Sequence, residues 1–347
     1  METLYLLGAG ASAGKINNHL SENEECIPTV SNFQIRLKSD LSRIQSLAED
    51  KDSVWSKISK SLIDDLILLH NGIVNMGTPD IFAKSLYLQG NKKDYTSVKR
   101  ALSFYLTYLQ LKENLLETID PRYIGFFSAT IEKKPHKPVQ FHPDIKIATW
   151  NYDLQIPLSL LVLLNKDLPD IHFFISDMYH TKLSQSENPG KIFRLNGYAG
   201  SYLFGNQING LYLEDIFDQN KNLNDKITKL IEIFDELRAK GDPFLNFAWD
   251  TDPIIIQERN KFFESLQNVK VIVVIGYSFP TFNRFIDREL FQSCKSLEKV
   301  YVLDTNPDIV KRVRGIFGNS KIVNQFIPEI QHISDIGQFV IPPELDQ

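Results

Sequence analysis

Short runs of apolar and β-branched residues recur along the chain and predict β-strands. They span Thr3–Leu7, Ile145–Trp150, Ile171–Ile175, Ile192–Leu195, Val269–Ile275 and Lys299–Leu303, with Lys321–Asn324 as a short edge. None of the runs alternates cleanly between apolar and polar residues, which is typical of parallel strands covered on both faces. Helical patterns separate the runs. The sequence therefore predicts an α/β fold, an open and mostly parallel Rossmann-like sheet with helices on both faces.

Apolar residues at three- and four-residue spacing predict the helices. These span Ser31–Leu47, Ser53–Leu69, Thr96–Ile119 and Asn224–Lys240, and in the third the apolar stripe comprises Val98, Leu102, Tyr105, Leu109 and Leu116. We expect residues 34–139 to form an inserted helical subdomain. Residues 1–33 and 140–347 would form the Rossmann-like domain, with a smaller helical insert at about 202–245.

Small and polar residues follow two of the predicted strands. The first strand opens into Gly8-Ala9-Gly10-Ala11-Ser12-Ala13-Gly14, and the second ends in Thr149-Trp150-Asn151-Tyr152-Asp153. Gly8 and Gly10 allow close backbone approach, and a strand-to-helix turn of this kind exposes N–H groups to a phosphate. Because open α/β sheets bind ligands at the carboxyl ends of their strands, the two runs predict a nucleotide held over the sheet.

Both runs also have purely structural explanations. The glycines suit a tight turn, and Asn and Asp side chains commonly bond to their own backbone at the end of a strand. A dinucleotide-dependent dehydrogenase is disfavoured, because the spacing Gly-x-Gly-x-x-x-Gly is one residue longer than the dinucleotide fingerprint at its third glycine. The segment Ser21–Phe33 also lacks a second strand ending in a ribose-binding acid.

Composition narrows the class of protein. The chain has 347 residues, 43% of them hydrophobic and 23% charged, as in an ordinary globular protein. Its net charge of -5 argues against a dedicated nucleic-acid binder. The two cysteines, Cys26 and Cys294, form neither a disulfide framework nor a cysteine zinc site, and we expect no metal. With no targeting segment and no apolar run long enough to cross a bilayer, we expect a cytoplasmic protein that does not engage a membrane.

The ordered set of motifs resembles the sirtuin superfamily, specifically its bacterial sirtuin-like NAD hydrolases. The matching residues are Gly8-Ala9-Gly10-Ala11-Ser12, Ile27-Pro28 with Phe33, Thr149-Trp150-Asn151-Tyr152-Asp153, Gly276-Tyr277-Ser278-Phe279 and Asp304-Thr305-Asn306-Pro307. They occur in the order found in the family and span nearly the whole predicted sheet. The helical insertions have no counterpart that we can assign.

The resemblance implies NAD as the ligand and a role for each motif. Gly8, Ala9, Gly10, Ala11 and Ser12 would cradle the pyrophosphate, with Pro28 and Phe33 also in the binding site. Gly276, Tyr277 and Ser278 would form the facing wall. Asp304 and Asn306 would lie near the adenosine, and Thr149, Asn151 and Asp153 near the nicotinamide ribose.

The chemistry of NAD cleavage suits an amide and a carboxylate at that place. Breaking the nicotinamide–ribose bond passes through an oxocarbenium-like state, as other glycosidic cleavages do. Nicotinamide leaves as a neutral molecule and needs no general acid. Asn151 and Asp153 can hold the ribose, stabilise the developing positive charge and position a water.

One position departs from the family pattern. Sirtuin-like enzymes usually carry a His-Gly after a later strand, with the histidine as base, and here Asn196 precedes Gly197. An amide has no useful basicity near neutral pH. Three interpretations remain open: a weak or inactive NAD binder, a different base such as Asp153 or His180, or a substitution that replaced a natural histidine.

The sequence thus predicts an NAD⁺ hydrolase that yields nicotinamide and ADP-ribose, with Asn151, Asp153 and Asn196 in the catalytic centre. By resemblance it would deplete NAD in antiviral defence, restrained by self-assembly or by a separate ATPase or sensor such as a HerA-type hexamer. The alternative is a non-catalytic module that binds NAD or ADP-ribose. Deacylation and ADP-ribosyl transfer are disfavoured, because two cysteines cannot build the four-cysteine zinc module of the deacylases.

Overall fold

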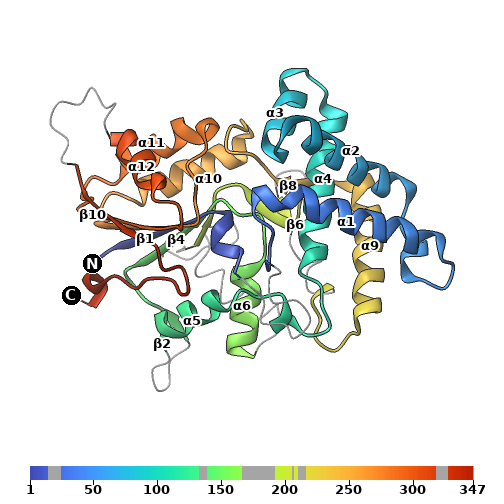
Figure 1. The fold of residues 1–347 in the computed structure, drawn as a ribbon, viewed down its shortest axis with the longest axis horizontal. Coiled ribbons are helices and arrows are strands. Elements are labelled where there is room, and N and C mark those ends of the chain that lie inside the picture. The colour runs from blue at the N-terminus through green and yellow to red at the C-terminus, as the bar shows by residue number, and fades with distance from the viewer. Residues whose placement is uncertain are drawn as a thin grey trace.

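A parallel sheet at the centre of the protein carries helices on both of its faces (Figure 1). The computed structural model describes residues 1–14, 25–132, 139–165, 192–204, 207–209, 216–317 and 327–346. The strands of the central sheet are β1 (Thr3–Leu7), β4 (Ile145–Thr149), β5 (Ile192–Arg194), β9 (Val271–Ile275), β10 (Lys299–Leu303) and β11 (Glu329–Ile333). The helices are α1 (Val30–Glu49), α2 (Lys60–Met76), α3 (Pro79–Leu88), α4 (Lys92–Leu109), α5 (Pro121–Thr130), α6 (Gln155–Leu164), α9 (Leu223–Lys240), α10 (Pro253–Glu264), α11 (Arg284–Ser293) and α12 (Asp308–Phe317).

The strand order of the sheet identifies where a ligand can bind. The order is β11-β10-β9-β1-β4-β5, and every neighbouring pair is parallel. If the six strands are numbered 1 to 6 in chain order, the sheet reads 3-2-1-4-5-6 from β5 to β11. This is the strand order of the doubly wound Rossmann fold. The direction of winding reverses between β1 and β9, where Leu7 lies opposite both Thr149 and Ile275. The carboxyl ends of β1, β4 and β9 therefore meet at the topological switch point.

Alternate residues of each strand pack into two separate hydrophobic clusters. Tyr5 and Leu7 of β1 join the cluster that includes α5 and α6, whereas Leu4 and Leu6 join the one formed with α10, α11 and α12. Both faces of the sheet are thus buried, which explains the unbroken apolar runs of its strands. The predicted α/β fold with helices on both faces is confirmed.

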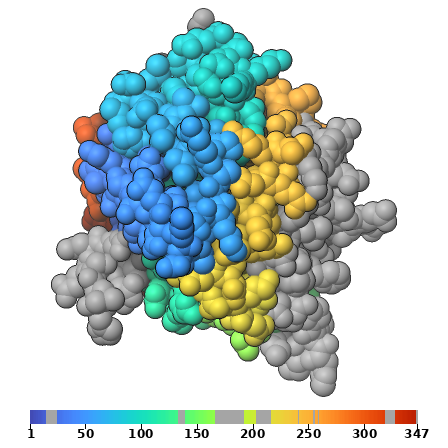
Figure 2. Space-filling model, turned by 90° about the vertical axis from the view of Figure 1, so that its right-hand side faces the viewer, coloured from blue at the N-terminus to red at the C-terminus, as the bar shows by residue number. Residues whose placement is uncertain are grey.

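A layer of helices extends the first cluster away from the sheet. It consists of α1–α4 and α9, and Figure 2 shows α9 in yellow beside α1 and α2 in blue. The buried carboxylate of Asp65 on α2 joins three of these helices, because it pairs with Arg100 of α4 at 3.0 Å and Arg238 of α9 at 3.2 Å. The segments 34–139 and 202–245 therefore pack against each other.

The segment 202–245 is not purely helical. Besides α9 it contains β7 (Gln207–Asn209) and β8 (Asp242–Leu245), which pair with β6 (Gly197–Phe204) in a small antiparallel sheet. A third, two-stranded sheet consists of β2 (Ile131–Glu132) and β3 (Gln140–Phe141). In the described part of the chain, no helix is both long enough and apolar enough to cross a membrane.

Two of the predicted helices have different bounds in the structure. The helix expected over Ser53–Leu69 begins only at Lys60, because the Ser59 hydroxyl accepts the Leu62 N–H, and it continues to Met76. The helix expected over Thr96–Ile119 ends at Leu109, since Asn114 caps a separate 3-10 helix, η3 (Leu115–Glu117). Leu116 is consequently 53% exposed and does not belong to the apolar stripe.

Several elements of the described residues were not predicted, among them α3, α5, β11 and the antiparallel strands β6, β7 and β8. α3 and α5 both begin at a proline that follows a capping residue, Thr78 or Asp120, which is a helix-start signal visible in the sequence. β11 is a half-exposed edge strand of mixed polarity, so it lacks the apolar run by which we recognised the others. The strands expected at Ile171–Ile175 and Lys321–Asn324 lie outside the described residues.

Candidate functional site

Three glycines bring the loops after β1 and β9 into backbone contact at the switch point. A Cβ on Gly8 would lie 2.5 Å from the Tyr277 Cα, and a Cβ on Gly10 would lie 2.8 Å from the Gly276 Cα. Gly276 has a φ of +57°, and a Cβ there would meet the Ala11 nitrogen at 2.4 Å. The glycines therefore serve first to pack the two loops against each other.

The backbone donors of the glycine loop are largely occupied. The N–H groups of Gly8 and Gly10 donate to the carbonyl oxygens of Ile275 and Gly276, both at 3.0 Å. The Ala11 N–H donates to the Gly8 carbonyl within the turn that leads into the 3-10 helix η1 (Ala9–Ser12). Among residues 8–11, the Ala9 N–H alone faces no acceptor from the described residues. The loop thus offers an anion fewer N–H groups than its sequence suggests.

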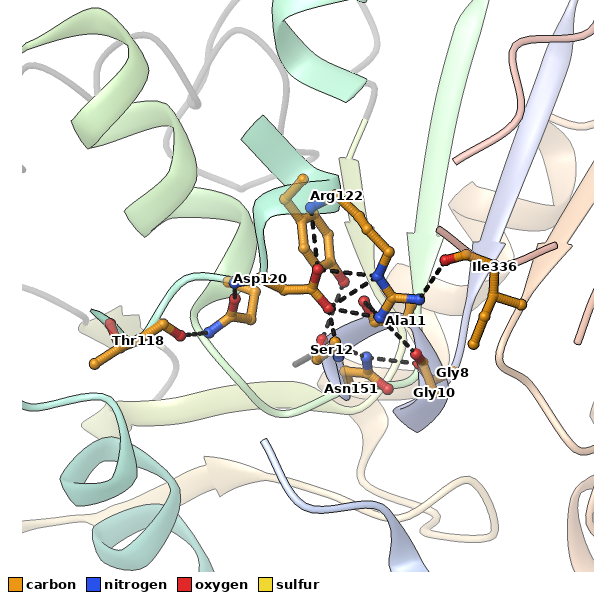
Figure 3. Close-up of polar contacts among 12 residues, drawn as sticks. Gly8, Gly10, Ala11, Ser12, Thr118, Asp120, Arg122, Asn151 and Ile336 are labelled. Carbon is orange, nitrogen blue, oxygen red and sulfur yellow. Dashed lines mark hydrogen bonds and ion pairs between the residues drawn. The ribbon is translucent and has the colours of Figure 1, made fainter. Parts of the chain in front are cut away.

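Ser12 and Asn151 lie together directly beneath this loop (Figure 3). The Asn151 amide donates to the Gly8 carbonyl at 2.9 Å and to the Ser12 hydroxyl at 3.1 Å. The Ser12 hydroxyl, which is completely buried, also lies 3.1 Å from the Tyr123 hydroxyl. The structure thus brings the glycine motif and the Asn-Asp motif together, and Asn151 fixes the end of β4 to the loop after β1.

A buried ion pair from α5 holds the other side of the glycine loop (Figure 3). Arg122 pairs with Asp120 and donates to the carbonyl oxygens of Gly10 at 3.0 Å and Ala11 at 3.2 Å. The Asp120 carboxylate in turn accepts the Gly14 N–H at 2.7 Å. Although burial opposes the charged form, the bond to Asp120 raises the pKa of Arg122. We did not single out this clamp from the sequence, where Asp120-Pro121-Arg122 resembles an ordinary helix start.

Asp153 is buried at the start of α6. Its carboxylate accepts the Gln155 N–H at 3.0 Å, and the side chain is adjacent to Ser12. Burial raises the pKa of Asp153, and the hydrogen bonds from Gln155 and Ser12 limit the rise. Thr149 behaves similarly, because its hydroxyl accepts the Asn151 N–H at 3.0 Å. The local backbone bonding that we considered as the structural alternative for Asn and Asp is thus present at Asp153, whereas the Asn151 amide bonds to Gly8 and Ser12 instead.

Asn196 lies at the end of β5 against a buried arginine from α10. The Arg259 guanidinium donates to the Asn196 amide oxygen at 3.1 Å. The amide nitrogen of Asn196 faces the Trp150 carbonyl at 3.4 Å and the Tyr152 hydroxyl at 3.5 Å. Burial lowers the pKa of Arg259 to about 10. Position 196 is thus next to the carboxyl end of β4, and its amide oxygen accepts from a buried guanidinium.

The amino end of α3 approaches the same edge of the sheet. Asp80 of α3, Trp249 and Phe282 line a hollow of about 380 Å³. Asp80 is one of the charges that raise the pKa of both Tyr152 and Tyr277, so it lies in the neighbourhood of both side chains. Burial raises the pKa of Asp80 itself to about 6. This carboxyl was not predicted, because it is more than forty residues from any motif.

The remaining predicted binding residues divide into buried and exposed groups. Pro28 and Phe33 are buried, and the Phe33 ring packs edge-on against Tyr105 at 5.4 Å. Ser278 is exposed. Asp304 and Asn306 accept backbone N–H groups of residues two positions ahead, at 2.8 and 3.0 Å. Phe33 therefore contributes to the helical core, whereas Asp304 and Asn306 shape the turn into α12.

Tyr277 is the buried member of the facing wall. Its hydroxyl donates to Asp287 at 2.8 Å and accepts from the Asn283 amide at 2.9 Å, and its ring stacks on Trp150 at 5.9 Å. Burial raises the pKa of Asp287 to about 7. This network holds the loop after β9 in place. His180, considered above as a base, lies outside the described residues.

Within the described residues, no group of three or more His, Cys, Asp or Glu side chains could hold a metal ion. Comparison with known proteins does not identify the chain. No protein-family model matches it, and no curated protein sequence matches it.

Proposed function

We propose that the chain binds NAD across the carboxyl ends of β1, β4 and β9 and hydrolyses its nicotinamide–ribose bond. The observation that carries the proposal is the coincidence of three features at one place. The winding of the sheet reverses between β1 and β9, the glycine loop lies at that reversal, and Asn151 reaches it from β4. Ligands of open α/β sheets bind at such switch points.

Two carboxyl groups near the ends of β4 and β9 suit the chemistry. Asp153 and Asp80 both have raised pKa values, so either can accept a proton from an attacking water more readily than an ordinary carboxylate. An ionised carboxylate near the ribose also stabilises the developing oxocarbenium ion. No general acid is needed, because nicotinamide leaves as a neutral molecule.

Nicotinamide release from NAD tests the proposal. Asp153→Asn and Asp80→Asn each remove a carboxylate and nearly preserve shape, and loss of the base should lower kcat by about 100-fold or more. The matched control is Asp308→Asn, an exposed carboxylate on α12 that pairs only locally, with Lys311. The hydrolase proposal fails if neither the wild-type chain nor Asn196→His, alone or with the physiological partner, releases nicotinamide.

The second candidate is a module that binds NAD or ADP-ribose without turnover. It is favoured by the amide at position 196, where a proton-accepting histidine would be expected. Tight NAD binding without turnover, by both the wild type and Asn196→His, would support this candidate. Turnover by Asn196→His alone would instead indicate an impaired hydrolase.

The proposed physiological role follows from the resemblance of the motifs to those of bacterial sirtuin-like NAD hydrolases. An NAD-depleting effector of antiviral defence must be restrained, by assembly with itself or with a HerA-type ATPase or another sensor. Exposed apolar side chains available for such contacts line the hollow beside α3, namely Ile81, Leu88 and Phe282. NAD consumption in phage-infected cells, with and without the partner gene, would test this role.

A further inference from the structure

Arg259 is a buried cation surrounded by neutral acceptors. It is only 6% exposed, and its guanidinium donates to the carbonyl oxygens of Leu195 at 3.0 Å, Ala248 at 2.6 Å and Phe247 at 3.0 Å. Its fourth acceptor is the Asn196 amide oxygen. Within the described residues no carboxylate forms an ion pair with it. Because burying an unpaired charge is costly, this arrangement requires an explanation.

Arg259 determines which way the Asn196 amide points. A guanidinium has only donors, so the amide must present its oxygen to Arg259 and its NH₂ group to the opposite side. That NH₂ group faces Trp150 and Tyr152 at 3.4 and 3.5 Å, which is longer than an ordinary hydrogen bond. A donor that is held in place but only weakly engaged therefore lies beside the carboxyl end of β4.

We propose that Arg259 is a positioning residue, which makes the side chain at position 196 a hydrogen-bond donor to a ligand oxygen and prevents it from accepting a proton. The ligand group is an uncharged oxygen acceptor, such as a ribose hydroxyl or a carboxamide oxygen. The identity of the ligand as NAD rests on the proposed function. The behaviour of position 196 toward protons does not, because it follows from Arg259 alone.

The titratable groups near Arg259 and Asn196 act on them from a distance. The titratable groups that act on Arg259 are Tyr152, Asp250 and Glu289, and those that act on Tyr152 also include Asp80 and Tyr95. None of these carboxylates is paired with Arg259, so a second positive charge at position 196 would face the guanidinium directly. Repulsion of this kind lowers the pKa of a basic group.

Titration of an introduced imidazole tests this inference without any measurement of activity. In Asn196→His, Arg259 should donate to one ring nitrogen, and the ring should stay neutral well below the ordinary histidine pKa of about 6.5. The measurement is an NMR pH titration of ¹³C-labelled histidine, with the chain's own histidines as internal references. Adding Arg259→Gln should raise the pKa of the introduced ring by about one unit or more. An introduced ring that titrates at or above 6.5, or does not respond to Arg259→Gln, overturns the inference.

Binding of NAD, measured by calorimetry, supplies the second readout. Asn196→Asp keeps an acceptor for Arg259 but removes the donor, so NAD affinity should fall about tenfold or more. Asn246→Asp is the matched control, because the buried Asn246 amide oxygen likewise accepts from a cation, the half-buried Lys99, at 2.8 Å. It should change affinity by less than about threefold. Unchanged binding by Asn196→Asp overturns the inference.

Failure of the proposed function gives a different result. If the wild-type chain does not bind NAD, the proposed function is wrong, and the imidazole titration alone decides the role of Arg259. If the double variant does not fold, the pKa of the single Asn196→His variant relative to the internal references decides it.

Discussion

Asp120 illustrates at the residue scale how one carboxylate maintains the candidate site. It is completely buried, and it satisfies Arg122 and the Gly14 N–H together. Replacing it by Asn leaves Arg122 as a buried cation without a counter-charge. We expect Asp120→Asn to lower the free energy of unfolding by about 3–5 kcal/mol, as measured by urea denaturation. The exposed control Asp308→Asn should leave the urea midpoint unchanged.

The raised pKa of Asp287 leads us to expect an unusual dependence of stability on pH. Its pKa is raised by burial from 3.8 to about 7, so between these values the folded state holds a proton that the unfolded state has released. Stability should therefore fall as the pH rises through this window, and this residue contributes at most roughly 4 kcal/mol to the change. Asp287→Asn removes this contribution. The stability of the variant relative to that of the wild type should therefore increase as the pH rises from 5 to 8. A stability difference that stays constant over that range would contradict the assignment.

Individual site residues could be predicted from the sequence only where they occur within a motif. Ser12 and Asn151 follow strands, and the structure places them 3.1 Å apart beneath the same loop. Asp80, Arg122 and Arg259 reach the site from helices, at positions that carry no local signal. The importance of Arg122 and Arg259 arises from burial and from partners distant in the chain, which a single sequence does not reveal.

At the scale of elements, the loops after β1 and β9 depend on the absence of a side chain. Gly276→Ala would place a Cβ 2.4 Å from Ala11 and would force a non-glycine residue to a φ of +57°. We expect it to lower the free energy of unfolding by about 2 kcal/mol or more, and to weaken nucleotide binding because the loops must separate.

Gly125→Ala is the matched control for that substitution. Gly125 lies within α5, and nothing within 4 Å would meet its Cβ. The substitution should raise the free energy of unfolding by about 0.5–1 kcal/mol, because alanine favours a helix. A similar loss of stability in both variants would show that the contact between the loops is not the cause.

Elements with a strong apolar pattern were predictable, and those defined by polar contacts were not. β1 and β10 have the predicted bounds, since each is buried on both faces. α4 ends early because Asn114 starts a new turn, and β11 is recognisable only by its pairing with β10. Short-range capping and edge pairing thus decided the boundaries that hydrophobic spacing could not.

At the scale of the whole molecule, sheet and helical layer share one continuous core. The first hydrophobic cluster runs from Tyr5 on β1 through α1–α4 to α9. We therefore expect the helical layer and the sheet to unfold in one transition. Trp55 is buried in the helical layer, and Trp150 is buried at the end of β4 on the other face of the sheet. Denaturation curves from variants that retain only Trp55 or only Trp150 should coincide with each other and with circular dichroism. Separate midpoints would indicate an independent helical subdomain.

The contact between Gly8, Gly10 and Gly276 also constrains how this protein could be redesigned. Because the two loops touch through their backbones, no side chain can adjust the gap between them, and a ligand must lie across their rim. Altered ligand preference is therefore better sought in side chains outside these loops, such as those at positions 80, 152, 196 and 249, while the glycines are left unchanged.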